Sequence, residues 1–155
     1  MQTNDPDLPA GSGAAATACR GAVAGAAAAM AWAALEPAAS RIMGTGYTDV
    51  SLLGRLVTRR RAWPLVGLGV HLANGAAFGA MAALAGVRTP GAGVAAASVE
   101  NVAVWPVMGV LDRVHPDRRS GRLGPLLTDG RVFAQETVMH AFFGAVLGAL
   151  LSRRR

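Results

Sequence analysis

The chain has 155 residues, of which 52% are hydrophobic and 15% are charged, and its formal net charge is +6. This length suits one compact domain. All 15 basic residues are arginines that lie between apolar stretches, which argues against a protein that binds nucleic acid. The single cysteine, Cys19, excludes an intramolecular disulfide and forms no metal-binding motif.

The beginning of the chain is predicted to carry no structure of its own. The first 13 residues contain two aspartates, two prolines and no basic residue. A signal peptide requires a positively charged first region, which is missing here. We therefore predict a disordered tail over residues 1–16.

Four apolar stretches follow, and we predict helices at about 17–36, 63–86, 92–112 and 131–152. Residues 62–87 contain no charged side chain, whereas 89–111 contain only Glu100 and 132–152 only Glu136. These three stretches exceed the roughly 20 residues that cross a hydrocarbon core. The first stretch is rich in alanine and glycine, and Pro106 predicts a kink in the third. The sequence thus predicts an all-α fold, a polytopic membrane four-helix bundle over residues 17–152.

The distribution of arginines predicts the orientation of this bundle. The connections 37–61 and 112–131 hold ten arginines, and the remainder of the chain holds five. The positive-inside rule places the ten-arginine side in the cytoplasm and both termini outside. We expect a multi-pass protein of a bacterial inner membrane, with the lipid bilayer as its main partner.

The first connection is predicted to contain a short amphipathic helix. Thr48 or Asp49 can cap its beginning. Leucines and a valine then form one apolar face: Leu52, Leu53, Leu56 and Val57. Such a helix would lie on the membrane surface, with Trp63 at the interface.

Small residues recur at a spacing that packs helices closely. The pattern H-xxx-G-xxx-G occurs twice, and a four-residue period keeps its members on one helical face. Glycines at that spacing let a second helix approach inside a membrane. The glycines predicted to pack helices are Gly21, Gly25, Gly75, Gly79, Gly144 and Gly148. The same small-residue faces would allow a homo-oligomer.

Polar residues of three predicted helices lie at a similar depth. They form a candidate buried cluster of His71, Asn74, Glu100, Glu136 and His140. At about 1.5 Å per residue, these groups lie about 6–16 Å from the cytoplasmic end. Buried ionisable groups should face one another. We expect Glu136 to pair with His140, and Glu100 to accept from His71 or Asn74.

Three functions fit this candidate cluster. A structural hydrogen-bond cluster that fixes helix packing is the preferred one. A proton or small-solute pathway is the usual role of ionisable groups inside a membrane. The third is a site for iron, zinc or manganese, or for a haem held by His71 and His140. No nucleophile motif, phosphate loop or dinucleotide fingerprint occurs, so we expect no enzyme and no cofactor.

Several segments resemble the YagU-like family of small integral membrane proteins. They are the run from His71, HLANGAAFGAMAA, together with Glu100, the run from Glu136, ETVMHAFFGAVLG, and the segment from Arg41, RIMGTGYTD. The likeness spans residues 20–151. It implies a four-helix inner-membrane protein, and it implies no biochemical activity.

Overall fold

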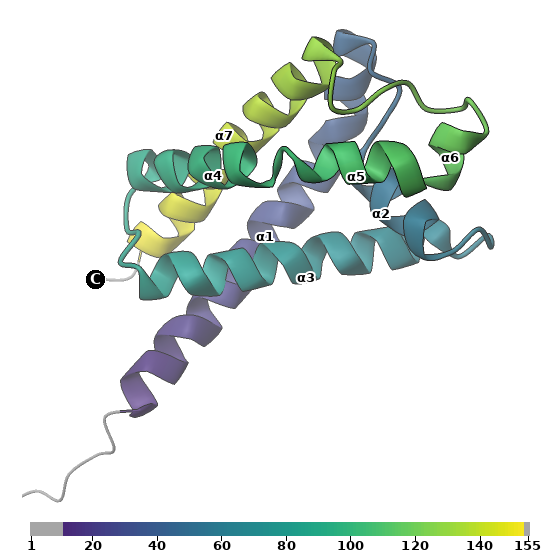
Figure 1. Cartoon of the computed structure of the whole chain (residues 1–155). Helices are drawn as coiled ribbons and strands as arrows, with labels where there is room; N and C mark the ends of the chain where they lie inside the picture. Colours follow the sequence, from purple (N-terminus) through teal and green to yellow (C-terminus); the bar gives the residue numbers. More distant parts are fainter. Residues whose placement is uncertain (1–10, 154–155) are drawn as a thin grey trace, which may run out of the picture.

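A computed structural model describes residues 11–153 and contains helices but no strand over that range (Figure 1). The predicted all-α fold class is confirmed. The helices are α1 Gly11–Met43, α2 Asp49–Val57, α3 Trp63–Leu84, α4 Pro90–Val104, α5 Val107–Val114, α6 Pro116–Arg119 and α7 Gly130–Ser152. Residues 1–10 of the predicted tail lie outside the described range, whereas residues 11–16 are helical and not disordered.

The first helix is longer than predicted. It was expected over 17–36, but α1 runs from Gly11 to Met43 with Pro37 inside it. A proline removes one backbone donor and usually ends or kinks a helix. Here the helix continues for almost two turns beyond Pro37. As a result Glu36 lies within α1 and not at its end.

Side-chain caps explain where three helices begin. Thr48 accepts from the backbone N–H of Ser51 at 3.2 Å, and Ser51 in return accepts from the N–H of Thr48. Thr89 caps α4, and Asp129 caps α7 by accepting from the N–H of Arg131 at 2.9 Å. Each cap satisfies a donor that the first helical turn leaves free. At α2, therefore, Thr48 is the cap, and Asp49 is free for other contacts.

The third predicted helix is broken in two. It was expected over 92–112, but α4 ends at Val104 and α5 begins at Val107. The two helices meet at an angle of 48°. Pro106 lies at this break, where it has no N–H to continue the helical hydrogen bonding.

Three helices are long and apolar enough to cross a membrane. They are Gly13–Met43, Trp63–Leu84 and Gly130–Ser152, and α4 with α5 forms a fourth if the bent pair is one span. Several large apolar side chains on these helices face outward, such as Val99, which is 70% exposed. The described helices therefore have the length and the outward-facing apolar surface of membrane spans.

Close glycine contacts join α1 to α3, and the two helices cross in Figure 1. A Cβ atom on Gly25 would lie 2.0 Å from the carbonyl oxygen of Gly75. A Cβ on Gly79 would lie 2.2 Å from the carbonyl oxygen of Gly21. Since only glycine fits at such distances, these residues set how closely the two backbones approach.

A second helix pair is formed by α4 and α7 in the same way. A Cβ on Gly144 would lie 2.4 Å from the carbonyl oxygen of Gly93, and one on Gly148 would lie 2.2 Å from that of Thr89. The two pairs are joined where α1 packs on α7. Trp32 and Leu147 are buried in the apolar core at this contact. The polar groups described next lie beside that core.

Candidate functional site

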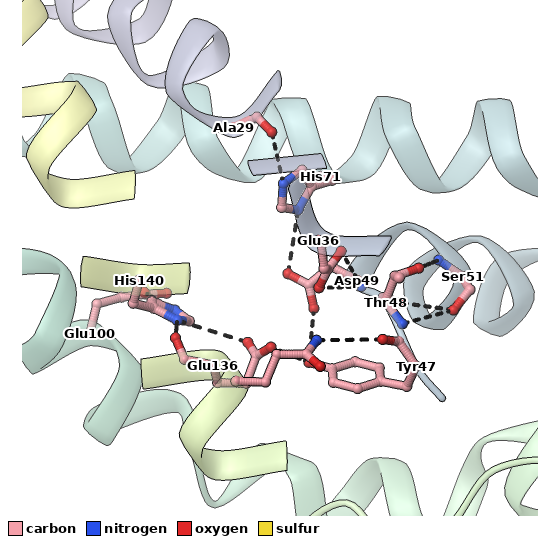
Figure 2. Close-up of polar contacts among 11 residues, drawn as sticks. Ala29, Glu36, Tyr47, Thr48, Asp49, Ser51, His71, Glu100, Glu136 and His140 are labelled. Carbon is pink, nitrogen blue, oxygen red and sulfur yellow. Dashed lines mark hydrogen bonds and ion pairs between the residues drawn. The ribbon is translucent and has the colours of Figure 1, made fainter. Parts of the chain in front are cut away.

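Most of the deeply buried polar side chains gather in one part of the molecule. This is where the last turns of α1, the loop 44–48, the start of α2 and the first half of α7 meet (Figure 2). Four of them are at most 2% exposed. We define the polar cluster as Glu36, Tyr47, Asp49, His71, Glu100, Gln135, Glu136 and His140.

Three carboxylates of the polar cluster, Glu36, Asp49 and Glu136, lie side by side. One ligand oxygen from each lies within 4.8 Å of the others, and we call these residues the carboxylate triad. Glu36 accepts from the backbone N–H of Asp49, at 2.9 Å to each of its oxygens. This bond holds the beginning of α2 against α1. The triad therefore joins three segments that are far apart in the sequence.

Tyr47 connects two members of the triad. Its hydroxyl donates to Glu136, and it lies 3.3 Å from Oδ1 of Asp49. A phenol has one proton, so it donates to only one of these two carboxylates at a time. The Tyr47 side chain is 1% exposed. Burial raises the pKa of this phenol well above its usual range, and the nearby charges of Asp49 and Glu136 raise it further.

His71 lies between α1 and the triad. Its Nε2 is 3.2 Å from the backbone oxygen of Ala29, and its Nδ1 is 3.4 Å from Oδ2 of Asp49. Because a carbonyl only accepts, Nε2 carries a proton. A neutral His71 thus directs a lone pair at Asp49, and only the doubly protonated ring donates to that carboxylate.

His140 lies on the other side of the triad, where it contacts α4. Its Nδ1 is 2.7 Å from the backbone oxygen of Glu136 and 3.8 Å from the Oε2 of the same residue. Its Nε2 is 2.9 Å from Oε2 of Glu100. Because Nδ1 donates to the carbonyl, the neutral ring has a lone pair on Nε2. The contact between Nε2 and the Glu100 carboxyl group therefore contains a proton on one of these two groups. The side chain of Glu100 is 37% exposed, so this pair is the most open part of the polar cluster.

Trp32 lies between the two histidines. Its ring centroid is 5.5 Å from that of His71 and 4.7 Å from that of His140, both in edge-on geometry. The indole Nε1 is buried and has no hydrogen-bond partner. Because this ring fills the space between the histidines, the haem alternative does not fit the structure.

Gln135 and Thr45 hold the loop 44–48 against α7. The hydroxyl of Thr45 donates to Oε1 of Gln135 at 2.5 Å, and Nε2 of Gln135 donates to the carbonyl of Tyr47 at 3.4 Å. These bonds fix the position of the Tyr47 side chain. They also satisfy the buried amide of Gln135, which is 0% exposed.

No arginine neutralises the polar cluster within residues 11–153. The arginine ion pairs there involve Asp112, Asp117 and Asp129, all outside the polar cluster. Three carboxylates at such short distances cannot all carry a charge in a buried site without compensation. Protons or a bound cation must therefore supply the balance.

The structure brings four of the five predicted cluster residues together and leaves one out. His71, Glu100, Glu136 and His140 belong to the polar cluster, whereas Asn74 is exposed on α3. The expected partners of Glu100 were also wrong, because it pairs with His140 and not with His71 or Asn74. The expected contact between Glu136 and His140 is present at 3.8 Å.

Sequence reasoning missed four members of the polar cluster: Glu36, Tyr47, Asp49 and Gln135. Glu36 stood at the end of the predicted first helix, and Asp49 was interpreted as a possible cap. A usable signal was present in the segment from Glu36 to Asp49. It contains two carboxylates and the only tyrosine of the chain, close to the end of a membrane-length apolar helix.

A cavity of about 1050 Å³ lies at the opposite end of α1 from the polar cluster. The first half of α1, the turn between α3 and α4 and the end of α7 line it, and we call it the vestibule. Cys19 and Arg20 are among its lining residues. Along α1 its lining extends to Ala27, two residues before Ala29, whose carbonyl contacts His71. Buried Ala28 and Leu147, both 0% exposed, belong to the apolar layer between the vestibule and the polar cluster.

Comparisons with protein-family models, curated proteins and solved structures find no match to this chain. The resemblance to the YagU-like proteins therefore stays a prediction.

Proposed function

We propose that this chain is an integral membrane protein whose interior conducts protons. Its spans would be α1, α3, the bent pair α4 and α5, and α7, joined as a four-helix bundle. Support comes from three apolar helices of sufficient length and from the bent fourth. The ten-arginine connections would face the cytoplasm, and α2 would lie at that surface of a bacterial plasma membrane.

The observation that carries the proposal is a series of proton-exchanging groups in which every step but one is within hydrogen-bonding distance, the longer step being that from His140 to the Glu136 carboxylate. In order of contact, this relay consists of Glu100, His140, Glu136, Tyr47, Asp49 and His71. The successive contacts are 2.9 Å and 3.8 Å, then the Tyr47–Glu136 hydrogen bond, then 3.3 Å and 3.4 Å. Carboxyl, imidazole and phenol groups all take up and release protons, and chains of such groups form proton paths in pumps and transporters.

The ends of this path are set by exposure. Glu100, whose side chain is 37% exposed, is the open end of the relay. The other end is His71, which contacts the carbonyl of Ala29 on α1, and the vestibule lies nearer the beginning of the same helix. The apolar layer at Ala28 and Leu147 separates the vestibule from the relay, so conduction requires water to enter this layer.

A structural role for the polar cluster is the second candidate. The bonds from Asp49 to Glu36 and from Thr45 to Gln135 tie α2 and the loop 44–48 to α1 and α7. Such interhelical bonds are worth about 0.6–2 kcal/mol each in a membrane. On this alternative the polar cluster stabilises the fold and carries no flux.

Proton flux into liposomes distinguishes the two candidates. Purified protein is reconstituted with a pH-sensitive dye inside the vesicles, and a potassium gradient with valinomycin sets the potential. We expect flux above that of empty vesicles, loss of this flux in Glu100→Gln, and normal flux in Asn74→Ala, which alters an exposed amide. Wild-type flux equal to that of empty vesicles would refute conduction. In that case a lower unfolding temperature of Glu100→Gln would favour the structural role.

A further inference from the structure

We propose that the carboxylate triad is a binding site for an oxygen-preferring divalent metal ion. This inference goes beyond proton conduction: the triad adds Glu36 to two residues of the relay, Asp49 and Glu136, and an ion bound there would block proton passage through these two carboxylates. The triad oxygens lie within 4.8 Å of one another, and oxygens opposite each other on such an ion lie about 4–5 Å apart. The three side chains therefore fit around one ion with small rotations.

The charge of the site favours a cation. Glu36 and Glu136 are 0% and 2% exposed, and the arginine pairs of the described chain all lie elsewhere. A divalent ion balances two of the three negative charges without any arginine. Hard oxygen ligands of this kind suit manganese, magnesium and calcium.

Trp32 provides a second, independent indication. Its side chain is 4% exposed, and its indole N–H has no hydrogen-bond partner. It lies one helical turn before Glu36 on the same face of α1, so the indole ring stands next to the triad along this helix. Buried donors in proteins are nearly always satisfied. In the loaded site this N–H would donate to a water or a carboxylate oxygen that is bound to the metal.

His71 supports a cation at the same place. Its Nε2 proton points at the carbonyl of Ala29, so the Nδ1 lone pair of the neutral ring points at Asp49, 3.4 Å away. Two acceptors that face each other need a proton or a cation between them. Imidazole nitrogen is also a good ligand for manganese-like ions, and the carbonyl contact fixes the ring in the required tautomer.

Manganese binding to the purified protein tests the site directly. Protein in detergent is treated with a chelator and dialysed against Mn²⁺, and bound manganese is counted by elemental analysis. We expect one ion per chain. We also expect at least a tenfold weaker affinity in Glu36→Gln and in Asp49→Asn, the second variant altering a less buried residue. Thermal unfolding of the chelator-treated samples verifies that both variants are folded.

Glu100→Gln is the matched control, because it breaks the relay and leaves the triad intact. It should bind Mn²⁺ as tightly as wild type while losing proton flux, so the two proposals fail separately. Stoichiometric binding should raise the unfolding temperature of wild type and not that of Glu36→Gln. Absence of stoichiometric Mn²⁺, or equal affinity in wild type and both triad variants, would overturn the metal site.

Discussion

Gly79→Ala should destabilise the fold although it adds a single methyl group. The new Cβ would lie 2.2 Å from the carbonyl oxygen of Gly21 and 2.7 Å from Cα of Gly25. Ordinary contact begins at about 3.4 Å, so α1 and α3 must separate by about 1 Å. Overpacking of this kind costs about 1–3 kcal/mol. Both neighbours are backbone atoms, which cannot rotate out of the way.

Gly69→Ala is the matched control on the same helix. A Cβ at Gly69 meets nothing within 4 Å. Alanine is a better helix former than glycine by about 0.5–1 kcal/mol, so this variant should be as stable as wild type or more stable. Thermal unfolding in detergent should then separate the two variants by several degrees, at about 2–4 °C per kcal/mol. Equal unfolding temperatures for Gly79→Ala and Gly69→Ala would refute the close-packing argument.

Three further outcomes follow from the structure. Tyr47→Phe should cost about 1 kcal/mol at neutral pH through the lost bond to Glu136. The pKa of Tyr47 is raised in the folded state, so the contribution of this group to the free energy of unfolding is complete below about pH 10 and is lost as the pH rises further. Urea unfolding should therefore show that the difference in the free energy of unfolding between wild type and Tyr47→Phe becomes smaller above about pH 10. Asn101→Ala should lower the unfolding temperature more than Asn74→Ala, because Asn101 is buried and donates to Thr137 at 3.2 Å. Reporter fusions in 37–61 and 112–131 should be active in the cytoplasm, and outside activity would reverse the orientation.

The helices and their close contacts were readable from the sequence because they depend on local patterns. Uninterrupted apolar stretches indicate helices of membrane length, and a four-residue glycine spacing marks the face that another helix can approach. The actual partners were not predictable in this way. Gly25 meets Gly75 on α3, and Gly144 meets Gly93 on α4, which is a matter of tertiary arrangement.

The polar cluster was only half predictable. His71, Glu100, Glu136 and His140 stood out because each interrupts an apolar stretch. Glu36 and Asp49 did not, since Glu36 stood at the predicted end of the first helix and Asp49 was interpreted as a possible cap of the short amphipathic helix. The depth of a residue along a helix does not say which face of the helix it lies on. For this reason Asn74, which is exposed, was grouped with buried residues.

The most direct test of the proposed proton path uses the only cysteine of the chain. Cys19 is exposed and lines the vestibule, so a bulky membrane-impermeant maleimide can reach it and obstruct the cavity. Proton flux is measured in liposomes before and after complete labelling, with Cys19→Ala as the unlabelled control. We predict that labelling abolishes wild-type flux and leaves that of Cys19→Ala unchanged. Full flux through completely labelled wild type would contradict a path through the vestibule.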